Sequence, residues 1–309
     1  MTEAANKVLP GQPCWIELYT AEPETSAEFY RGLFSWSIEK SDPDSPLANV
    51  ISLSENMIGT IESLSEKTPY SGWLVCLTTS DMNDLVDKVE VAGGNVVIAP
   101  VRVDEAMVYA VVEDPDGSRV GVLHDPTFTG SSAPVPGMPV WYDVMSRDFE
   151  RCVAFYGDVF GWDRCPIDGD EVPYVTNGEG DNAVCGIGEM THCDDPDAVP
   201  GWRVHFGVTN IDETAAQVIR LGGEVLSEAA DTPWLRPQIL TVRVSCSSRF
   251  ESLVGCTEAF PVAPSVARVG GGLDGPGLKP RFTPPGQVRA MCERMLVSPG
   301  CGYQGQILP

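Results

Sequence analysis

The chain has 309 residues, a length typical of two domains, and its 43% hydrophobic and 21% charged residues are ordinary for a soluble globular protein. Its net charge of −24, from 44 acidic against 20 basic residues, argues against nucleic-acid and anionic membrane surfaces as partners. No apolar run is long enough to span a membrane and no secretory signal opens the chain, so we expect a cytoplasmic protein.

The ten cysteines show no Cys-x-x-Cys spacing, which argues against zinc ribbons and thioredoxin-type motifs. In a long cytoplasmic chain a disulfide framework is also not expected. We therefore expect buried, reduced thiols.

Strand and helix patterns alternate from the start of the chain. The first half predicts strands near 15–19, 35–39, 49–53, 57–62, 73–78, 107–113 and 119–123. A first helix opens at Pro23, and a second has Ser80 as its expected N-cap and ends at Gly93-Gly94. Asp114-Pro115-Asp116-Gly117 predicts a tight turn before the last strand.

The same pattern recurs in the second half of the chain. Pro13-Cys14-Trp15 matches Pro139-Val140-Trp141, and Phe29-Tyr30 matches Phe155-Tyr156, both at an offset of 126 residues. Gly72-Trp73 matches Gly201-Trp202, and Gly93-Gly94 matches Gly222-Gly223, at an offset of 129. Four aligned blocks with one small change of length indicate a duplication, in which each copy is β-α-β-β-β twice.

The order of these motifs resembles the vicinal-oxygen-chelate superfamily of glyoxalases, bleomycin-resistance proteins and extradiol dioxygenases. It is most similar to two-domain actinobacterial members labelled hydroxylase-like or glyoxalase-like, over about residues 11–241. The resemblance implies an α+β fold in which four βαβββ modules form two domains, each a cup-shaped, eight-stranded mixed sheet around its ligand. We expect domains at 11–125 and 137–254, joined by a linker at 126–136. The pattern leaves open whether modules pair within or across the domains, and whether the chain is a monomer or a homodimer.

Metal-binding members of this superfamily hold a divalent ion with side chains on the first, fourth, fifth and eighth strands. By that resemblance the first-strand position falls on Trp15 and Trp141, and the fifth-strand position on Leu74 and Arg203. The fourth falls near 59–60 and 185–186, and the eighth on Gly121, with no clear counterpart in the second copy. These residues are not a ligand set, so we expect no inherited metal site and no cofactor.

Strand alternation identifies the side chains that share the ligand face with the two tryptophans. In the first copy they are Trp15, Glu17, Tyr19 and Cys76, and in the second Trp141, Asp143, Met145, Arg203 and His205. Asp143 and His205 suit proton abstraction, and Arg203 suits an anionic substrate, although such a pair can equally be a structural polar layer. A tryptophan on a strand is usually core, but here it can also form a wall for a flat ligand.

The second copy departs from the pattern after about Trp234. Val242–Cys246 replaces the expected Asp-Pro-Asp-Gly turn, so the pattern does not establish the last strand of the second domain. Residues 1–234 carry 12 basic and 40 acidic residues, whereas 235–309 carry 8 and 4 and are rich in Pro and Gly, a composition that favours a disordered tail from 255 onward. One hypothesis is a shifted reading frame between Trp234 and about Gly255. Finding no Asp-Pro-x-Gly strand-turn-strand in another frame of the coding DNA would contradict it.

Two classes of function follow, and the residues leave open whether the chain is an enzyme. The first is a metal-independent, glyoxalase-like protein that binds a small apolar or aromatic molecule, as a carrier or sequestering protein would. The alternative is an enzyme: a metal-dependent lyase, isomerase or dioxygenase with Glu17, Cys76, Asp143 or His205 as new ligands, or a metal-free hydroxylase-like enzyme using Asp143 and His205.

Overall fold

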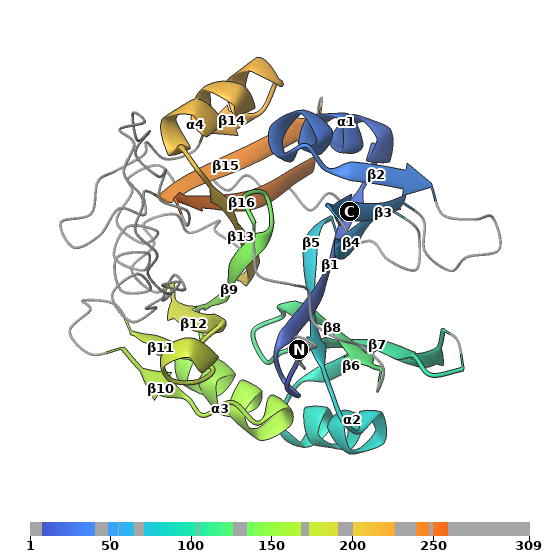
Figure 1. Cartoon of the computed structure of the whole chain (residues 1–309). Coiled ribbons are helices and arrows are strands. Elements are labelled where there is room, and N and C mark those ends of the chain that lie inside the picture. Colours follow the sequence, from blue (N-terminus) through green and yellow to red (C-terminus); the bar gives the residue numbers. More distant parts are fainter. Residues whose placement is uncertain are drawn as a thin grey trace, which may run out of the picture.

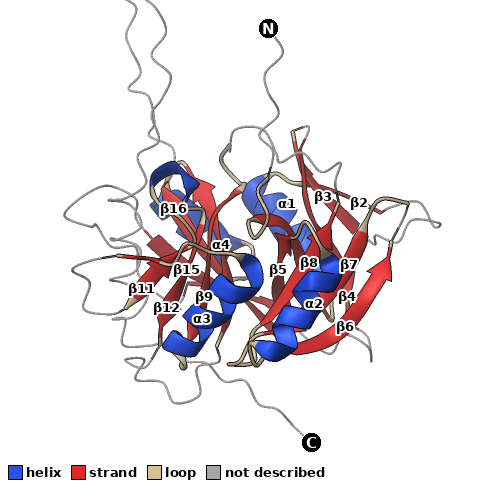
Figure 2. Cartoon of the chain, turned by 90° about the horizontal axis from the view of Figure 1, so that it is seen from below, coloured by secondary structure: helices blue, strands red, loops and turns tan. Residues whose placement is uncertain are grey.

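In the computed structural model, the described residues form two mixed sheets that pack together, with four α-helices in pairs at the two ends of their interface (Figures 1 and 2). The structure describes residues 8–40, 49–54, 56–64, 71–103, 105–125, 135–167, 173–190, 200–225, 239–246 and 250–258. Among the helices of these ranges, none is long and apolar enough to cross a membrane.

The first sheet is built from residues 13–124. Its elements are β1 (Pro13–Thr20), α1 (Pro23–Phe34), β2 (Ser37–Lys40), β3 (Asn49–Leu53), β4 (Asn56–Ser63), β5 (Gly72–Thr78), α2 (Met82–Val91), β6 (Asn95–Arg102), β7 (Val108–Glu113) and β8 (Arg119–His124). The pattern misses β6, which returns the chain from α2 to the sheet edge.

The second sheet repeats this order with shorter edge strands and one 3-10 turn. Its elements are β9 (Pro139–Ser146), α3 (Phe149–Phe160), β10 (Cys165–Pro166), β11 (Tyr174–Thr176), η1 (Gly180–Asn182), β12 (Cys185–Glu189), β13 (Gly201–Val208), α4 (Ile211–Arg220), β14 (Glu224–Val225), β15 (Ile239–Cys246) and β16 (Phe250–Glu258).

The two sheets have equivalent topology. The strand order is β2-β3-β4-β1-β5-β8-β7-β6 in the first and β10-β11-β12-β9-β13-β16-β15-β14 in the second. In each, the first and fifth strands pair antiparallel at the centre, with parallel neighbours on either side. The halves of each sheet thus come from one continuous stretch of chain.

The helix ends follow local sequence with one correction. Pro23 is the first residue of α1, where its missing N–H costs no hydrogen bond. The N-cap of α2 is Asp81 and not Ser80: its carboxylate accepts the backbone N–H groups of Asn83 and Asp84 at 3.0 and 3.1 Å. An ionised N-cap also complements the positive end of the helix dipole.

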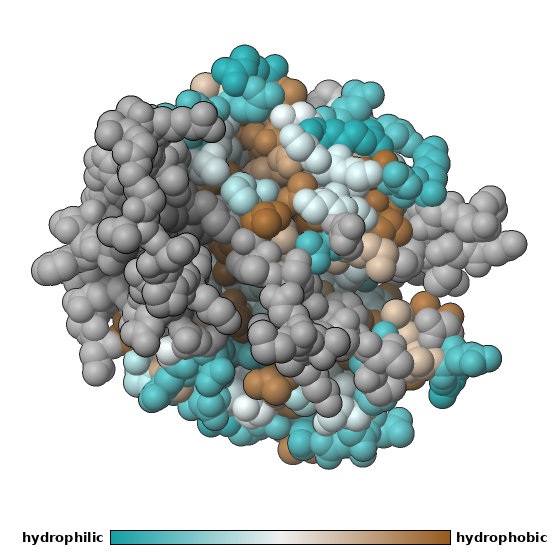
Figure 3. Space-filling model, viewed as in Figure 1, coloured by the Kyte–Doolittle hydropathy of each residue, from teal (hydrophilic) through white to brown (hydrophobic). Residues whose placement is uncertain are grey.

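The helix-facing sides of both sheets share one hydrophobic core. Ile16 and Leu18 of β1 belong to it, as do Val144 of β9 and Val204 of β13. The opposite side of each sheet carries the alternate residues, which is the arrangement that strand alternation predicts. Hydrophilic side chains cover the outer surfaces of the helices at the upper and lower edges of the molecule (Figure 3).

Two tryptophans dock the halves onto each other reciprocally. The Trp36 indole N–H donates to the carbonyl of Gly137, and the Trp162 indole N–H donates to that of Gly11, both at 2.9 Å. The two glycines precede β9 and β1 and have positive φ angles of 91° and 80°, a conformation that favours glycine. Each domain therefore fixes the start of the other domain's central strand.

Helices α1 and α4 lie side by side at one end of this interface, and α2 and α3 at the other (Figure 1). A Cβ atom at Gly94 would lie 2.6 Å from the Phe155 ring, and one at Gly223 would lie 2.9 Å from the Phe29 ring. The Gly-Gly pairs thus make room for a phenylalanine of the other domain, a packing role beyond the helix end that the sequence predicts.

The Asp-Pro-Asp-Gly turn, placed between β7 and β8, also crosses the interface. Oδ1 of Asp114 accepts the N–H groups of Asp116 and Ser118, both at 2.9 Å, and closes the turn. Oδ2 accepts the Tyr156 hydroxyl at 3.1 Å and the Cys152 thiol at 3.7 Å, both from α3. Burial raises the pKa of Asp114 to about 6, because desolvation outweighs these donors.

The second aspartate of the turn adds hydrogen bonds to the second domain. Oδ2 of Asp116 accepts the Ser146 hydroxyl at 2.9 Å and the Arg147 N–H at 2.6 Å, where β9 ends. The turn therefore holds the β9–α3 junction of the second domain.

The last two strands close the second sheet. Val242–Cys246 lies within β15, which forms a hairpin with β16, and β16 pairs in parallel with β13. The last strand that the sequence does not establish is therefore present, and it runs to Glu258, beyond the boundary expected at 254. The tail from 259 onward, most of the linker and the segment around Trp234 lie outside the described residues.

Replacing Asp114 tests the turn as an interdomain contact. We expect Asp114→Ala to lower the free energy of unfolding by about 2 kcal/mol or more, because it leaves the buried Tyr156 hydroxyl without its acceptor. Asp87→Ala, an exposed residue of α2, is the control and should change it by less than about 0.5 kcal/mol. Urea unfolding of both variants gives the comparison, and equal effects would contradict the assignment.

Candidate functional site

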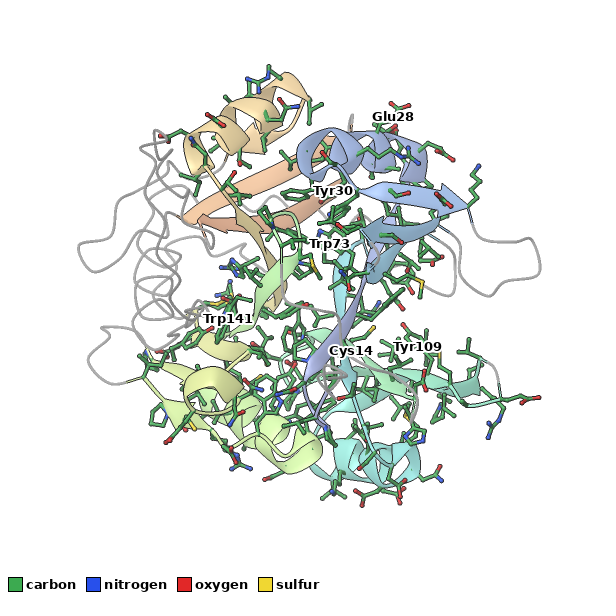
Figure 4. All side chains as sticks on the ribbon, in the orientation of Figure 1. Cys14, Glu28, Tyr30, Trp73, Tyr109 and Trp141 are labelled. Atoms are coloured by element: carbon green, nitrogen blue, oxygen red, sulfur yellow. The ribbon has the colours of Figure 1, made fainter. Side chains whose placement is uncertain are left out.

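The face of each sheet that points away from the helices gathers the candidate site residues. The face of the first sheet is called the Trp15 face and carries Trp15, Glu17, Tyr19, Thr60, Leu74, Cys76 and Tyr109. The face of the second sheet is called the Trp141 face and carries Trp141, Asp143, Met145, Tyr174, Arg203 and His205. In Figure 4 Tyr109 and Trp141 lie on opposite sides of Cys14. The structure thus brings the predicted residues together as two separate groups, one on each sheet.

Glu17 is the centre of the Trp15 face. It lies opposite Leu74 of β5 and beside Thr60 of β4, and only 8% of its surface is exposed. The hydroxyls of Tyr19 and Tyr109 both donate to its Oε2, at 2.9 and 2.8 Å. The carboxyl is therefore held by two phenols in a largely apolar setting.

The surroundings of Glu17 favour its neutral form. Burial raises the pKa of Glu17 above its usual range, against the lowering effect of the two tyrosine hydrogen bonds. Nearby Glu62 raises the pKa further. Within the described ranges no ion pair involves Glu17, so no cation offsets this cost.

Two cysteines lie close to this group as reduced thiols. Burial raises the pKa values of Cys76 and Cys14 above the usual range of a thiol, and the charge of Glu17 adds to both shifts. The Cys14 thiol also donates to the carbonyl of Cys76 at 3.3 Å. The five cysteines whose side chains the structure describes are free, and these two are held as thiols and not as reactive thiolates.

The Trp141 face places a different chemistry at the equivalent positions. Asp143 pairs with Arg203 in the strand register, as Glu17 does with Leu74. Nε2 of His205 lies 3.3 Å from Oδ2 of Asp143, and their side chains are 1% and 2% exposed. In the part of the chain that the structure describes, Oδ1 of Asp143 and both ring nitrogens of His205 have no hydrogen-bond partner of good geometry.

Aromatic side chains complete the Trp141 face. The Trp141 indole N–H donates to the Tyr174 hydroxyl at 2.9 Å, and both residues are buried. A Cβ atom at Gly186 would lie 2.5 Å from that hydroxyl, so the glycine of β12 makes room for the tyrosine ring. Met145 is also buried, and its thioether lies against Gly188.

Sequence reasoning misses Tyr109 and Tyr174, which hold the two faces. Both lie on strands that do not neighbour the two central ones, and their side-chain hydrogen bonds show that they reach Glu17 and Trp141. The alternation within 107–113 is the one signal that places Tyr109 on a defined face.

The residues on these faces do not fit a divalent metal ion. In the first sheet, the positions that hold metal ligands in metal-binding members of the superfamily that the sequence resembles carry Trp15, Thr60, Leu74 and Gly121. In the second sheet the eighth-strand register places Gly255 beside His205, so this position is glycine in both sheets. Among the residues that the structure describes, no group of three or more His, Cys, Asp or Glu side chains has a metal-binding arrangement.

The alternative ligands are also divided between the sheets. Glu17 and Cys76 lie on the first, whereas Asp143 and His205 lie on the second. Each face thus supplies two such donors, one fewer than the three protein ligands of a typical catalytic zinc site.

Comparisons with known families match both halves of the chain. The model described as Glyoxalase/Bleomycin resistance protein/Dioxygenase superfamily matches residues 13–122. A second model, described as Glyoxalase-like domain, matches residues 140–243. Each match spans most of one sheet.

Two relatives align with this chain over most of their length and most of its own. The anthracycline biosynthesis protein DauV of Streptomyces sp. (strain C5) is 30% identical over 281 residues, which covers 82% of this chain and 96% of DauV. The anthracycline biosynthesis protein DnrV of Streptomyces peucetius is 31% identical over 251 residues, covering 72% of this chain and 86% of DnrV.

A solved structure shares the fold. The Mn(II)-bound glyoxalase from Novosphingobium aromaticivorans superposes with a TM-score of 0.57 at 14% identity, covering 82% of this chain and 88% of that one. At this identity the likeness is one of fold alone.

Glu17→Gln tests the state of the buried carboxyl. The raised pKa means that ionisation opposes folding, so the wild type loses stability as the pH rises from about 4.3, the usual pKa of Glu, toward the raised value in the folded protein. The glutamine cannot ionise, so we expect the variant to gain stability relative to the wild type between pH 4.5 and 8, as measured by urea unfolding.

The control is Glu28→Gln, on the exposed side of α1 (Figure 4). We expect its stability to follow that of the wild type across the same pH range. If the free energy of unfolding of the wild type instead rises relative to that of Glu17→Gln as the pH rises, the folded protein stabilises the carboxylate, and this account is contradicted.

Proposed function

Because the chain belongs to the glyoxalase/bleomycin resistance protein/dioxygenase superfamily, we propose that it is a metal-independent protein that binds a flat aromatic small molecule. The ligand lies within the cup that two βαβββ modules form in each domain, against the Trp15 or the Trp141 face. As a carrier or sequestering protein, it would hold its ligand without changing it.

One observation carries the proposal. At the positions where metal-binding members place ligands, the Trp15 face carries tryptophan, threonine, leucine and glycine, and the one acid beside them is held by two phenols. Aromatic and apolar walls with a few buried polar groups are the usual form of a small-molecule site. The names of DauV and DnrV place those two relatives in the biosynthesis of an aromatic product class, which supports an aromatic ligand here.

Fluorene, a flat and purely apolar aromatic, is the probe for this proposal. We expect it to quench tryptophan fluorescence equally before and after treatment with EDTA. Trp15→Ala and Trp141→Ala should each weaken binding at one face by about tenfold, because the indole is the stacking surface. Val91→Ala, an exposed residue of α2, is the control and should bind as the wild type does.

Two results would contradict the proposal. One is binding that disappears with EDTA and returns with a divalent metal ion. The other is wild-type affinity in both tryptophan variants when their folding is intact by circular dichroism.

The Asp143–His205 pair favours a second function, metal-free proton transfer. Nε2 of His205 faces Asp143, which leaves Nδ1 as the ring nitrogen able to accept a proton, and the carboxylate would stabilise the imidazolium that forms. Arg203, which pairs with Asp143 in the register, suits the anionic group of a substrate.

Exchange of a carbon-bound proton tests this second function. With fluorene-9-carboxylate in D2O, the C9–H bond breaks, its electron pair stays on the ring system, the proton passes to Nδ1, and a deuteron returns from solvent. We expect loss of the C9 proton signal in NMR spectra that resists EDTA and is abolished in His205→Ala. If the wild type exchanges the C9 proton no faster than the uncatalysed reaction does, the proton-transfer function is contradicted and binding is the only proposed function that stands.

A further inference from the structure

The two faces place an acid at the same position with opposite surroundings. Glu17 and Asp143 occupy equivalent positions on β1 and β9, each opposite the fifth strand of its sheet. Where the Trp141 face has Arg203 and His205 beside its acid, the Trp15 face has Leu74 and Cys76. Only the second acid therefore has cationic or ionisable nitrogen groups at these positions.

Among the described residues, the titratable groups around Glu17 come from four strands and none is cationic: Cys14 and Tyr19 of β1, Glu62 of β4, Cys76 of β5 and Tyr109 of β7. Burial without a cation favours the protonated form of a carboxyl, because an unpaired buried charge is costly. The neutral acid then has one oxygen that accepts and one that donates.

The tyrosines determine which oxygen donates. Both hydroxyls point to Oε2, which therefore acts as the carbonyl oxygen of the neutral acid. The proton of the neutral acid is then placed on Oε1; among the described residues the buried Cys76 thiol is the other side chain that hydrogen-bonds this carboxyl. Glu17 and Trp15 share one face of β1, so a flat ligand stacked on the indole would lie beside the Glu17 carboxyl.

We propose that the Trp15 face selects a neutral aromatic ligand with a carbonyl oxygen, an aromatic ketone or quinone, through a hydrogen bond donated by the Glu17 carboxyl. This inference rests on the proposed function and adds the chemical class of the ligand. The Trp141 face, with Arg203 and His205, suits an anionic ligand instead.

A matched pair of probes separates the hydrogen bond from the stacking. 9-Fluorenone carries a carbonyl oxygen, whereas fluorene has the same ring skeleton without it. We measure both in the Trp141→Ala background, because Arg203 and His205 could also donate to a carbonyl. We expect fluorenone to bind about tenfold more tightly than fluorene, the gain from one buried hydrogen bond.

Substitutions at Glu17 identify the donor. Glu17→Met has a similar shape but no donor, so the ratio of the fluorene to the fluorenone dissociation constant should fall to within about twofold. Glu17→Gln keeps an N–H donor and should retain most of the preference. An unchanged preference in Glu17→Met, or an equal loss in both variants, would overturn the proposal.

The infrared carbonyl stretch of bound fluorenone provides a test that does not require a substitution at Glu17. We expect the stretch to shift to lower frequency than in an apolar solvent, as a hydrogen-bonded carbonyl does, and an unshifted band would overturn the proposal even if Glu17→Met fails to fold. If fluorene and fluorenone bind equally, the carbonyl preference is wrong but aromatic binding stands. If neither binds, the proposed function itself fails.

Discussion

Two reciprocal hydrogen bonds hold the geometry on which both faces depend. The Trp36 and Trp162 indoles each donate to the carbonyl of a glycine that precedes the other domain's first strand. β1 and β9 are therefore anchored by the opposite domain, with their helix-facing residues in one shared core. Because side chains alternate along a strand, burying Ile16 and Val144 in that core turns Glu17 and Asp143 to the outer faces.

Much of the fold could be predicted from the sequence because it depends on local patterns. The duplication, the alternation along the first strands and the position of Pro23 all follow from residues close together in the chain. The predicted N-cap of α2 is wrong by one residue because Ser80 and Asp81 are both good capping residues. Only the backbone geometry shows which side chain reaches the free N–H groups. The sequence alone does not establish the last strand, because the turn that marks it in the first copy is absent and the strand pairs with β13 without that turn.

The candidate site could be predicted only in part, for the same reason. Strand alternation places Trp15 and Glu17 together, and Asp143 with Trp141, because they are two residues apart. Tyr109 and Tyr174 contact these residues across 92 and 33 positions of the chain, and no local pattern reports that distance. The aspartates of the Asp-Pro-Asp-Gly turn predict a turn, yet their contacts with Tyr156 and Ser146 depend on how two domains pack.

Duplication has left two faces with one architecture and different chemistry. The acid of the first strand persists in both copies, with phenols beside it in one and an imidazole beside it in the other. A neutral carboxyl is a hydrogen-bond donor, whereas a carboxylate beside a histidine supports proton transfer. Under the proposed function, neither role requires a metal ion.

Metal content is the most direct test of this account. Elemental mass spectrometry of the purified, folded chain, before any chelator is added, counts metal atoms per molecule. The account predicts iron, zinc, nickel and manganese each well below one atom per chain. A near-stoichiometric amount of any of them would contradict it and would show that side chains on these faces form a metal site after all.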